Sequence, residues 1–357
     1  MNDSRIEQYA RLLVERSLNV QPNWQVVINA SPLARPLVQA AVQCIAERGA
    51  YALVRMNYAD IAATWLKRAP VELIQTASPI EEFMLTHMDA YLSISAPENS
   101  HDGSDVPPER LAAFNRSRAS YIKRVMTNNL IWVGCNFPTQ ALAQDANMTL
   151  EQYADFLYGA CLLNWDALVR EMRARADYFD RASEVHLRGA GTDLRFSLDG
   201  RVAMIDDGHL NMPGGEFFYS PVEDSAEGFI TYDEYPAIYQ GRAVEGVRLE
   251  FRDGVVVNAS ARTNEAFLIQ VLDSDAGARK LGELGVGCNP GIQNHMRDVL
   301  YDEKIQGTIH LAIGAGFPFI GGTNVSAVHW DMVKNLRDGG QILLDGRVVQ
   351  ENGVWLI

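Results

Sequence analysis

Near the C-terminus, one residue separates a histidine from an aspartate: His329 and Asp331 lie in the segment Ser-Ala-Val-His-Trp-Asp-Met-Val at residues 326–333. If the segment is a β-strand, side chains alternate between its two faces, so that His329 and Asp331 share one face. An imidazole and a carboxylate at one point can bind a borderline divalent metal ion. They also fit a hydrogen-bonded pair on a solvated strand, and the pattern alone leaves both interpretations open.

Three further segments place an acidic or imidazole side chain beside glycine, in a strand-like or turn-like context. These are Met-Pro-Gly-Gly-Glu-Phe-Phe-Tyr-Ser-Pro with Glu216, Leu-Gly-Glu-Leu-Gly-Val-Gly-Cys-Asn-Pro with Glu283, and Thr-Ile-His-Leu-Ala-Ile-Gly-Ala-Gly with His310. A glutamate in apolar surroundings has to be exposed, paired or bound to a metal ion. Each glutamate also fits a surface or capping position, and His310 also fits a hydrogen-bonded histidine of the core.

Together the four segments supply two glutamates, two histidines and one aspartate: Glu216, Glu283, His310, His329 and Asp331. Nitrogen and oxygen ligands of this kind suit Zn, Mn, Co or Fe, whereas two imidazoles are few for copper. A pair of metal ions ~3.5 to 4 Å apart needs a bridging carboxylate and several terminal ligands. Five such groups are enough for one or two divalent metal ions.

The four segments resemble, in order, the signature blocks of the M29 metallopeptidases, the thermophilic aminopeptidase family. The matching stretches begin at about residue 211 and end at residue 333. The resemblance implies that two divalent metal ions (Zn, Co or Mn) are bound by Glu216, Glu283, His310, His329 and Asp331, with Glu216 and Glu283 also catalytic. It further implies a homodimeric hydrolase that releases N-terminal residues from peptides through a water activated by two metal ions.

One position departs from the family pattern. The family has a tyrosine seven residues after the histidine of the third block, and this chain has Phe317 there. A phenyl ring can neither coordinate a metal ion nor donate a hydrogen bond to a developing oxyanion. The departure therefore bears on peptide cleavage rather than on metal binding. The other candidate sources of a hydroxyl group are Tyr219, Tyr232 and Tyr301.

A second, more distant resemblance is to the ring-cleaving 2,5-dihydroxypyridine dioxygenases, which hold a single Fe(II) with two histidines and one aspartate. They share the His329–Asp331 pattern, have a histidine where this chain has Glu283, and lack counterparts of Glu216 and His310. At all three positions this chain agrees with the two-metal family. A mononuclear Fe(II) dioxygenase, or another non-peptidase of the same fold, is the alternative enzyme. The non-enzymatic alternatives are a protein whose metal ions are structural and a small-molecule binding module built on a peptidase fold.

Composition narrows the possible partners and location. The 357 residues are 47% apolar, so the chain can bury a large core, and its net charge of −14 disfavours nucleic acid or an anionic membrane as partner. The four cysteines are scattered, and we find neither a signal peptide nor an apolar stretch of ~18 residues. We therefore expect a cytoplasmic protein that acts on a peptide or small-molecule substrate.

The elements that have to position these residues fall into two groups. Apolar runs at 24–29, 51–56, 90–96 and 129–134 alternate with helical patterns, which predicts an α/β domain with a mostly parallel sheet over residues 1–182. Its last helix is predicted from Thr149, which forms a capping box with Gln152, to about Ala176. Short strands with Gly turns follow, beginning with a hairpin at 184–198, so residues 183–357 are predicted to form a strand-rich α+β metal-binding domain.

Overall fold

The chain divides into two compact units. The computed structural model describes residues 3–126 and 129–357. Unit 1 comprises Met1–Leu162 and Gly208–Pro213, and unit 2 comprises Leu163–Asp207 and Gly214–Ile357. The predicted domain boundary at residue 182 lies inside unit 2 and remains a prediction about which parts fold independently.

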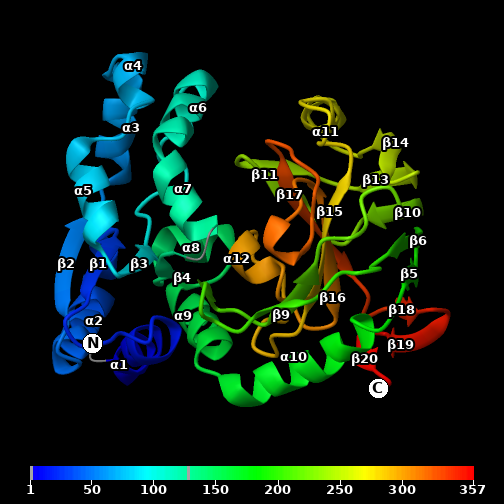
Figure 1. The fold of residues 1–357 in the computed structure, drawn as a ribbon, viewed down its shortest axis with the longest axis horizontal. Helices are drawn as coiled ribbons and strands as arrows, with labels where there is room; N and C mark the ends of the chain where they lie inside the picture. The colour runs from blue at the N-terminus through cyan, green and yellow to red at the C-terminus, as the bar shows by residue number, and fades with distance from the viewer. Residues whose placement is uncertain (1–2, 127–128) are drawn as a thin grey trace. The chain divides into compact units, whose positions relative to one another are not determined.

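Unit 1 contains a five-stranded sheet in the order β2-β1-β3-β4-β8, with every pair parallel (Figure 1). Its strands are β1 (Gln25–Ala30), β2 (Tyr51–Met56), β3 (Ala90–Ser95), β4 (Ile131–Asn136) and β8 (Asn211–Met212). Helices such as α2 (Arg35–Glu47) connect successive strands, as parallel pairing requires. The predicted α/β architecture is therefore confirmed.

The predicted helix from Thr149 to Ala176 is two helices. The capping box at its start is confirmed, because Thr149 Oγ1 accepts from the Gln152 backbone and the Gln152 side chain accepts from the Thr149 backbone. The first helix, α9 (Leu150–Cys161), ends where Leu162 leaves the helical region with ψ 56°. The side chain of Asn164 then caps α10 (Trp165–Phe179). The continuous helical pattern conceals this break because Asn164 is a capping residue within an apolar run.

Unit 2 is built from antiparallel sheets. The largest has eight strands in the order β14-β13-β10-β6-β5-β18-β19-β20. Six of them are β10 (Glu227–Tyr232), β13 (Val247–Arg252), β14 (Val255–Ser260), β18 (Gln341–Leu344), β19 (Arg347–Glu351) and β20 (Val354–Trp355). It includes the predicted hairpin, β5 (Glu184–Gly189) and β6 (Thr192–Ser197), and the positive φ of Gly191 (62°) supports its tight turn. The strand-rich second half is thereby confirmed.

A second sheet of unit 2 has the strand order β17-β16-β15-β9-β7. Its strands are β7 (Met204–Asp206), β9 (Glu216–Tyr219), β15 (Leu281–Gly287), β16 (Thr308–Gly314) and β17 (His329–Asn335). Every residue of the two central strands, β15 and β16, is buried. Both faces of this sheet are therefore covered by protein, and the polar groups on it have to be satisfied there.

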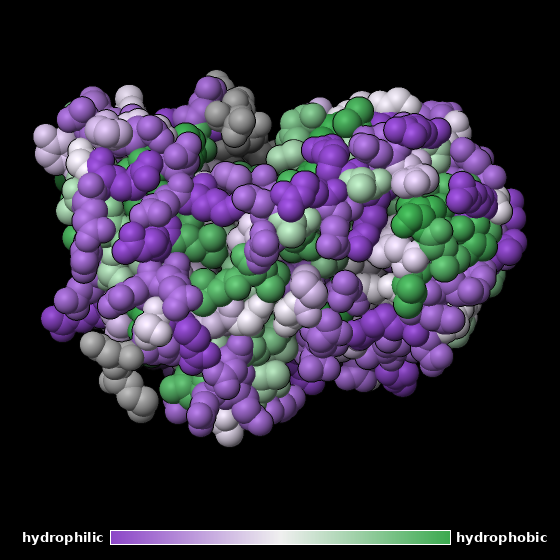
Figure 2. All heavy atoms as spheres, turned by 90° about the horizontal axis from the view of Figure 1, so that it is seen from below, coloured by the Kyte–Doolittle hydropathy of each residue, from purple (hydrophilic) through white to green (hydrophobic). Residues whose placement is uncertain are grey.

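Among the residues that the structure describes, no helix is long and apolar enough to cross a membrane. Figure 2 shows polar residues over much of the face that it presents, with apolar residues in separate patches. The four cysteines are buried free thiols.

Candidate metal centre

All five predicted ligands lie on one face of the five-stranded sheet of unit 2. The strand pairs place Glu216 opposite Gly287, His310 opposite Gly285, Asp331 opposite Ala312, and His329 opposite Gly314. The last of the five, Glu283, also lies opposite Ala312 on this face. The predicted alternation in β17 is confirmed, since Trp330 and Met332 point to the opposite, buried face. Ligand side chains therefore project over neighbouring positions that carry little or no side chain.

The small residues leave the space in which the ligands lie. A Cβ atom built on Gly285 would overlap the imidazole ring of His310. One built on Gly287 would overlap the carbonyl oxygen of Ile305, which belongs to the loop that runs over the end of β15. Glycine at these positions thus lets an imidazole ring and a loop approach the sheet closely.

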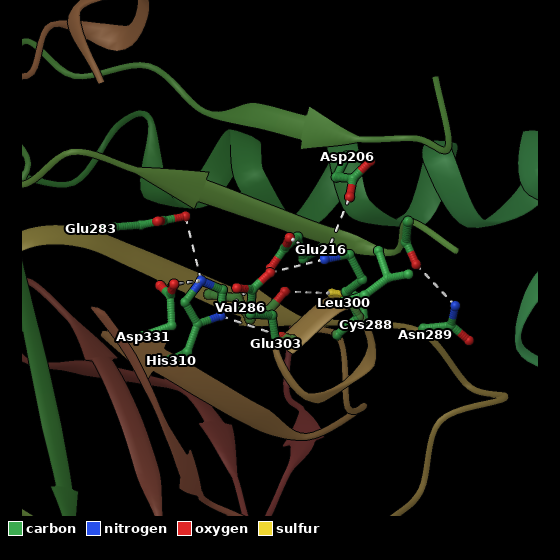
Figure 3. A network of polar contacts seen from close by, with 12 residues as sticks. Asp206, Glu216, Glu283, Val286, Cys288, Asn289, Leu300, Glu303, His310 and Asp331 are labelled. Atoms are coloured by element: carbon green, nitrogen blue, oxygen red, sulfur yellow. Dashed lines mark hydrogen bonds and ion pairs between the residues drawn. The ribbon is translucent and has the colours of Figure 1, made fainter. Parts of the chain in front are cut away.

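Four of the five residues converge. The two oxygens of Glu283 face different histidines: Oε1 lies 3.4 Å from His310 Nε2, and Oε2 lies 3.0 Å from His329 Nε2. Oδ1 of Asp331 lies 3.9 Å and 3.6 Å from the same two nitrogens. Figure 3 shows Glu283 and Asp331 directed toward His310. Within the described part of the chain, Glu283, His310 and Asp331 form a group compact enough to hold one metal ion.

The two histidines present the same ring nitrogen to this group. Nδ1 of His310 contacts the Glu303 carbonyl oxygen at 3.3 Å, and Nδ1 of His329 contacts the Ala315 carbonyl oxygen at 2.9 Å. In neutral histidine, a proton on Nδ1 that is donated to a carbonyl leaves the Nε2 lone pair for a metal ion. Both rings are thus oriented as metal ligands usually are.

Glu216 lies beside the converging group. Its Oε2 is 3.5 Å from Nδ1 of His310, on the opposite side of that ring from Glu283. Its Oε1 is 2.9 Å from Nζ of Lys304. The structure therefore places Glu216 next to the four other predicted ligands and divides its two oxygens between Lys304 and the metal centre.

Two carboxylate oxygens test whether a metal ion fits. Within residues 3–126 and 129–357, Glu216 Oε2 and Asp331 Oδ1 are buried and have no hydrogen-bond partner. Leaving a buried carboxylate oxygen without a donor is costly. A cation bound by Glu283, His310 and Asp331 would satisfy Asp331 Oδ1, and these nitrogen and oxygen donors suit Zn, Co, Mn or Fe. Glu216 Oε2 lies beside this group, 3.5 Å from Nδ1 of His310. The residues present therefore fit a divalent metal ion.

The charges of the cluster strongly shift the pKa values of its members. Burial alone would raise the pKa of Glu283, but hydrogen bonds from His310 and His329 outweigh it and lower the pKa to about 2. Burial alone would lower the pKa of each histidine, yet the surrounding carboxylates raise the pKa of both His310 and His329 to about 10. Without a metal ion, the two imidazoles thus carry protons and act as the counter-ions of Glu283.

The remaining carboxylates behave differently. Burial raises the pKa of Glu216 despite the opposing charges of Lys304 and His310. Burial likewise raises the pKa of Asp331, against the attraction of His329. Glu216 and Asp331 are the two side chains with a buried oxygen that makes no hydrogen bond within the described residues. Their negative charges are therefore the least stabilised in the cluster without a metal ion.

Sequence reasoning missed three charged residues of this region: Asp206, Glu303 and Lys304. The side chain of Lys304 is fully buried, and its Nζ lies 3.0 Å from Glu303 Oε2 and 3.7 Å from Asp206 Oδ2. The available signal was the run Asp-Glu-Lys at 302–304, which also fits an exposed helix end. Only the fold brings these residues to Glu216.

Phe317 lies beside His329, the most exposed of the five predicted ligands. The side chain of His329 is 30% exposed, whereas that of His310 is 1% exposed. The Phe317 ring is 5.0 Å from the His329 ring, centroid to centroid, and it also contacts the rings of Phe218 and Phe319. Position 317 is thus next to the metal centre, and aromatic side chains flank His329.

The three tyrosines named as other hydroxyl sources differ in position. The Tyr219 hydroxyl is 2.8 Å from Asp180 Oδ1 and donates to the Ala176 carbonyl at 3.1 Å, on the face away from the ligands. Burial first, and then the charge of Asp331, raise the pKa of Tyr232. Of the three tyrosines, Tyr232 is thus one whose pKa is raised by the charge of a predicted ligand, Asp331. A role for Tyr301 remains a prediction.

Comparison with known proteins decides the family. The family described as thermophilic metalloprotease (M29) matches residues 2–355. The chain belongs to the M29 family. Curated relatives of this M29 protein include aminopeptidase 2 of Geobacillus stearothermophilus, 28% identical over 88% of this chain and 84% of the relative. Aminopeptidase AmpS of Bacillus subtilis is 26% identical over 88% and 85%.

A solved structure extends the likeness to the fold. The wild-type AmpT structure from Thermus thermophilus has a TM-score of 0.86 at 22% identity and covers 99% of both chains. At this identity the match shows a shared fold and nothing finer. The M29 family is one of metallo-aminopeptidases, and the ligand geometry of this member has to be argued from its own residues.

Proposed function

We propose that this M29 protein is a metal-dependent aminopeptidase that releases N-terminal residues from peptides. The observation that carries the proposal is the convergence of Glu283, His310, His329 and Asp331 on one sheet face, with buried carboxylate oxygens left unpaired. Two divalent ions, when bound, would lower the pKa of a water molecule and polarise the scissile carbonyl group. Membership of the M29 family indicates the class of reaction. The nitrogen and oxygen ligands can bind the metal ions that this reaction needs.

The contacts of each predicted ligand indicate its proposed role. Glu283, whose two oxygens face different histidines, would hold the metal ions together with His310, His329 and Asp331. Glu216 is the fifth ligand, through Oε2.

The proton from the attacking water needs an acceptor that can deliver it to the leaving amine. The pKa of Glu283 is lowered to about 2, so it is a poor proton carrier. Glu216 contacts Lys304 through Oε1 and is assigned to the metal ions through Oε2, so neither of the two predicted catalytic glutamates is a suitable proton carrier.

Metal analysis combined with peptide cleavage tests the proposal. Purified protein is expected to hold about two divalent ions by mass spectrometry and to release the first residue from unblocked peptides. A chelator should abolish cleavage, and Zn, Co or Mn should restore it. The matched control is the same peptide with an acetylated N-terminus, which an aminopeptidase leaves intact.

Other outcomes would point elsewhere. Protein that binds one Fe(II) and consumes oxygen with a dihydroxypyridine would support the ring-cleaving alternative. Protein that binds metal ions but cleaves no peptide would mean that Phe317 marks a change of reaction. Protein without any metal affinity would refute the proposal and leave the binding module.

A further inference from the structure

Lys304 is a fully buried cation beside the metal centre. It follows the short helix α12 (Val299–Asp302), and its exposed fraction is 0%. Its Nζ lies 2.9 Å from Oε1 of Glu216 and 3.0 Å from Oε2 of Glu303. A lysine is almost never buried without anionic partners, so this position needs a reason.

The fold holds Lys304 in place through its backbone. The Lys304 carbonyl accepts from the Asn289 backbone at 3.0 Å, and its own N–H donates to the Tyr301 carbonyl at 3.0 Å. The next residue, Ile305, passes over Gly287, where a Cβ atom would overlap its carbonyl. Gly287 pairs with Glu216 across β15 and β9, so this glycine brings the lysine segment to the glutamate.

The sheet itself creates a need for a cation at this point. Asp206 of β7 lies directly opposite Glu216 of β9, and both are 5% exposed. Like charges directly opposite each other destabilise a strand pair, the more so where water is excluded. The ammonium group of Lys304 contacts both carboxylates, at 3.7 Å and 2.9 Å. It therefore offsets their repulsion.

The same contact makes the two oxygens of Glu216 unequal. Oε1 contacts Lys304, whereas Oε2 is buried, lies 3.5 Å from Nδ1 of His310 and makes no hydrogen bond within the described residues. We propose that Lys304 is a positioning residue that holds Glu216 by one oxygen, so that Glu216 binds metal through the other oxygen alone. This inference rests on the proposed function, because it takes Glu216 to be a ligand.

The test is a double-mutant cycle read by metal binding. Lys304→Met removes the charge at similar length, and Glu216→Gln removes the carboxylate on which Lys304 is proposed to act. Affinity for Co(II) and its absorption spectrum are measured for the parent protein, both single variants and the double variant. A double-mutant cycle separates an effect that passes through Glu216 from an independent one.

Lys334 provides the matched control. It is also a buried lysine, 2% exposed, and its Nζ lies 2.7 Å from Glu234 Oε1 and 3.2 Å from the Ala190 carbonyl. It extends from β17 on the face opposite the ligands. Lys334→Met thus removes an equally buried cation from the same sheet, and we expect it to leave the Co(II) affinity and spectrum unchanged.

The expected result is specific. Lys304→Met should weaken Co(II) binding by about ten- to a hundredfold, in the range typical for partners of metal ligands, and should alter the spectrum. In the Glu216→Gln background the same change should add little. An affinity equal to or above that of the parent protein, or additive effects in the cycle, would overturn the inference.

Failure of the variant to fold and failure of the parent protein to bind Co(II) have different meanings. If Lys304→Met does not fold, Lys304→Gln, which retains a hydrogen-bond donor, takes its place, and an unchanged Co(II) spectrum in that variant would also overturn the inference. If the parent protein binds no Co(II), the proposed function fails before the role of Lys304 is reached.

Discussion

The two faces of the β15, β16 and β17 strands are made by the same backbone but carry opposite kinds of side chain. One face bears Glu283, His310, His329 and Asp331, and the other bears apolar residues such as Leu311 and Met332, each 1% exposed. The alternation of a strand separates the two kinds of side chain, with the buried Lys334 of β17 as a charged exception on the apolar face. Within one sheet, metal binding and core stability therefore depend on different residues that are neighbours in sequence.

The largest expected effect comes from the ligand face. Glu283→Ala removes the carboxylate that contacts both histidines, so we expect the protein to lose its metal ions and its activity while it stays folded. Elemental analysis and circular dichroism measure the two properties. Glu234→Ala, which removes the partner of Lys334, is the control and should retain the metal ions. Full metal content in Glu283→Ala would contradict the ligand assignment.

The opposite face should show the converse. Leu311→Ala leaves a cavity in the core, and we expect the free energy of unfolding to fall by about 2–5 kcal/mol. Metal content below the unfolding transition should not change, because Leu311 points away from the ligands. Denaturant unfolding together with metal analysis measures both properties. Loss of metal ions from the folded variant would contradict the claim that the two faces act separately.

The ligand face should also respond to pH in its own way. In metal-free protein, the pKa values of His310 and His329 are raised from 6.5 to about 10. Their contribution to folding stability is therefore complete below pH 6.5 and is lost as the pH rises through about 10. A metal ion needs the neutral imidazole, so binding expels these protons, and the apparent affinity should rise with pH up to about 10.

Calorimetry in buffers of different ionisation enthalpy measures this proton release. We expect about tenfold in affinity per pH unit for each proton expelled. Thermal unfolding provides a second reading, because the gap between metal-loaded and metal-free protein should widen from pH 7 to pH 9. An affinity independent of pH would mean that the histidines are not ligands.

The smallest expected effect is at the edge of the ligand face. Phe317→Tyr places a hydroxyl group near His329, and we expect kcat for peptide cleavage to rise roughly tenfold, with unchanged metal content. Phe319→Tyr adds a hydroxyl to the neighbouring ring, which contacts Phe317, and serves as the control. Equal rates in Phe317→Tyr and the parent protein would mean that the missing hydroxyl does not limit this chain.

Local patterns predicted the parts of the molecule that depend on local chemistry. The strand rhythm of unit 1, the capping box at Thr149 and the alternation in β17 all follow from neighbours in sequence, and the structure contains them. The break between α9 and α10 did not follow, because Asn164 reads as a tolerated helix residue until its side chain is seen to cap the next helix.

The candidate site was predictable as a set of residue types and not as an arrangement. The order of the four segments that resemble the family indicates which side chains are ligands, but only the folded sheet shows that Glu216 contacts Nδ1 of His310 and Glu283 contacts Nε2. The role of Lys304 could not be predicted either, because a lysine in a polar run is expected to be exposed. It is buried only because residues distant in sequence pack around it. A homodimer and a cytoplasmic location remain predictions.

The backbone at residue 317 is fixed by bonds that do not involve its side chain. Its N–H donates to the buried Oγ of Ser220 at 2.8 Å, and its carbonyl accepts from the Gly322 backbone at 2.9 Å. Whatever side chain stands at position 317, the chain path beside His329 can therefore stay the same. A single substitution at that position can exchange one reacting group for another while the five ligands keep their places, which makes this position a natural point for the chemistry of the fold to diverge.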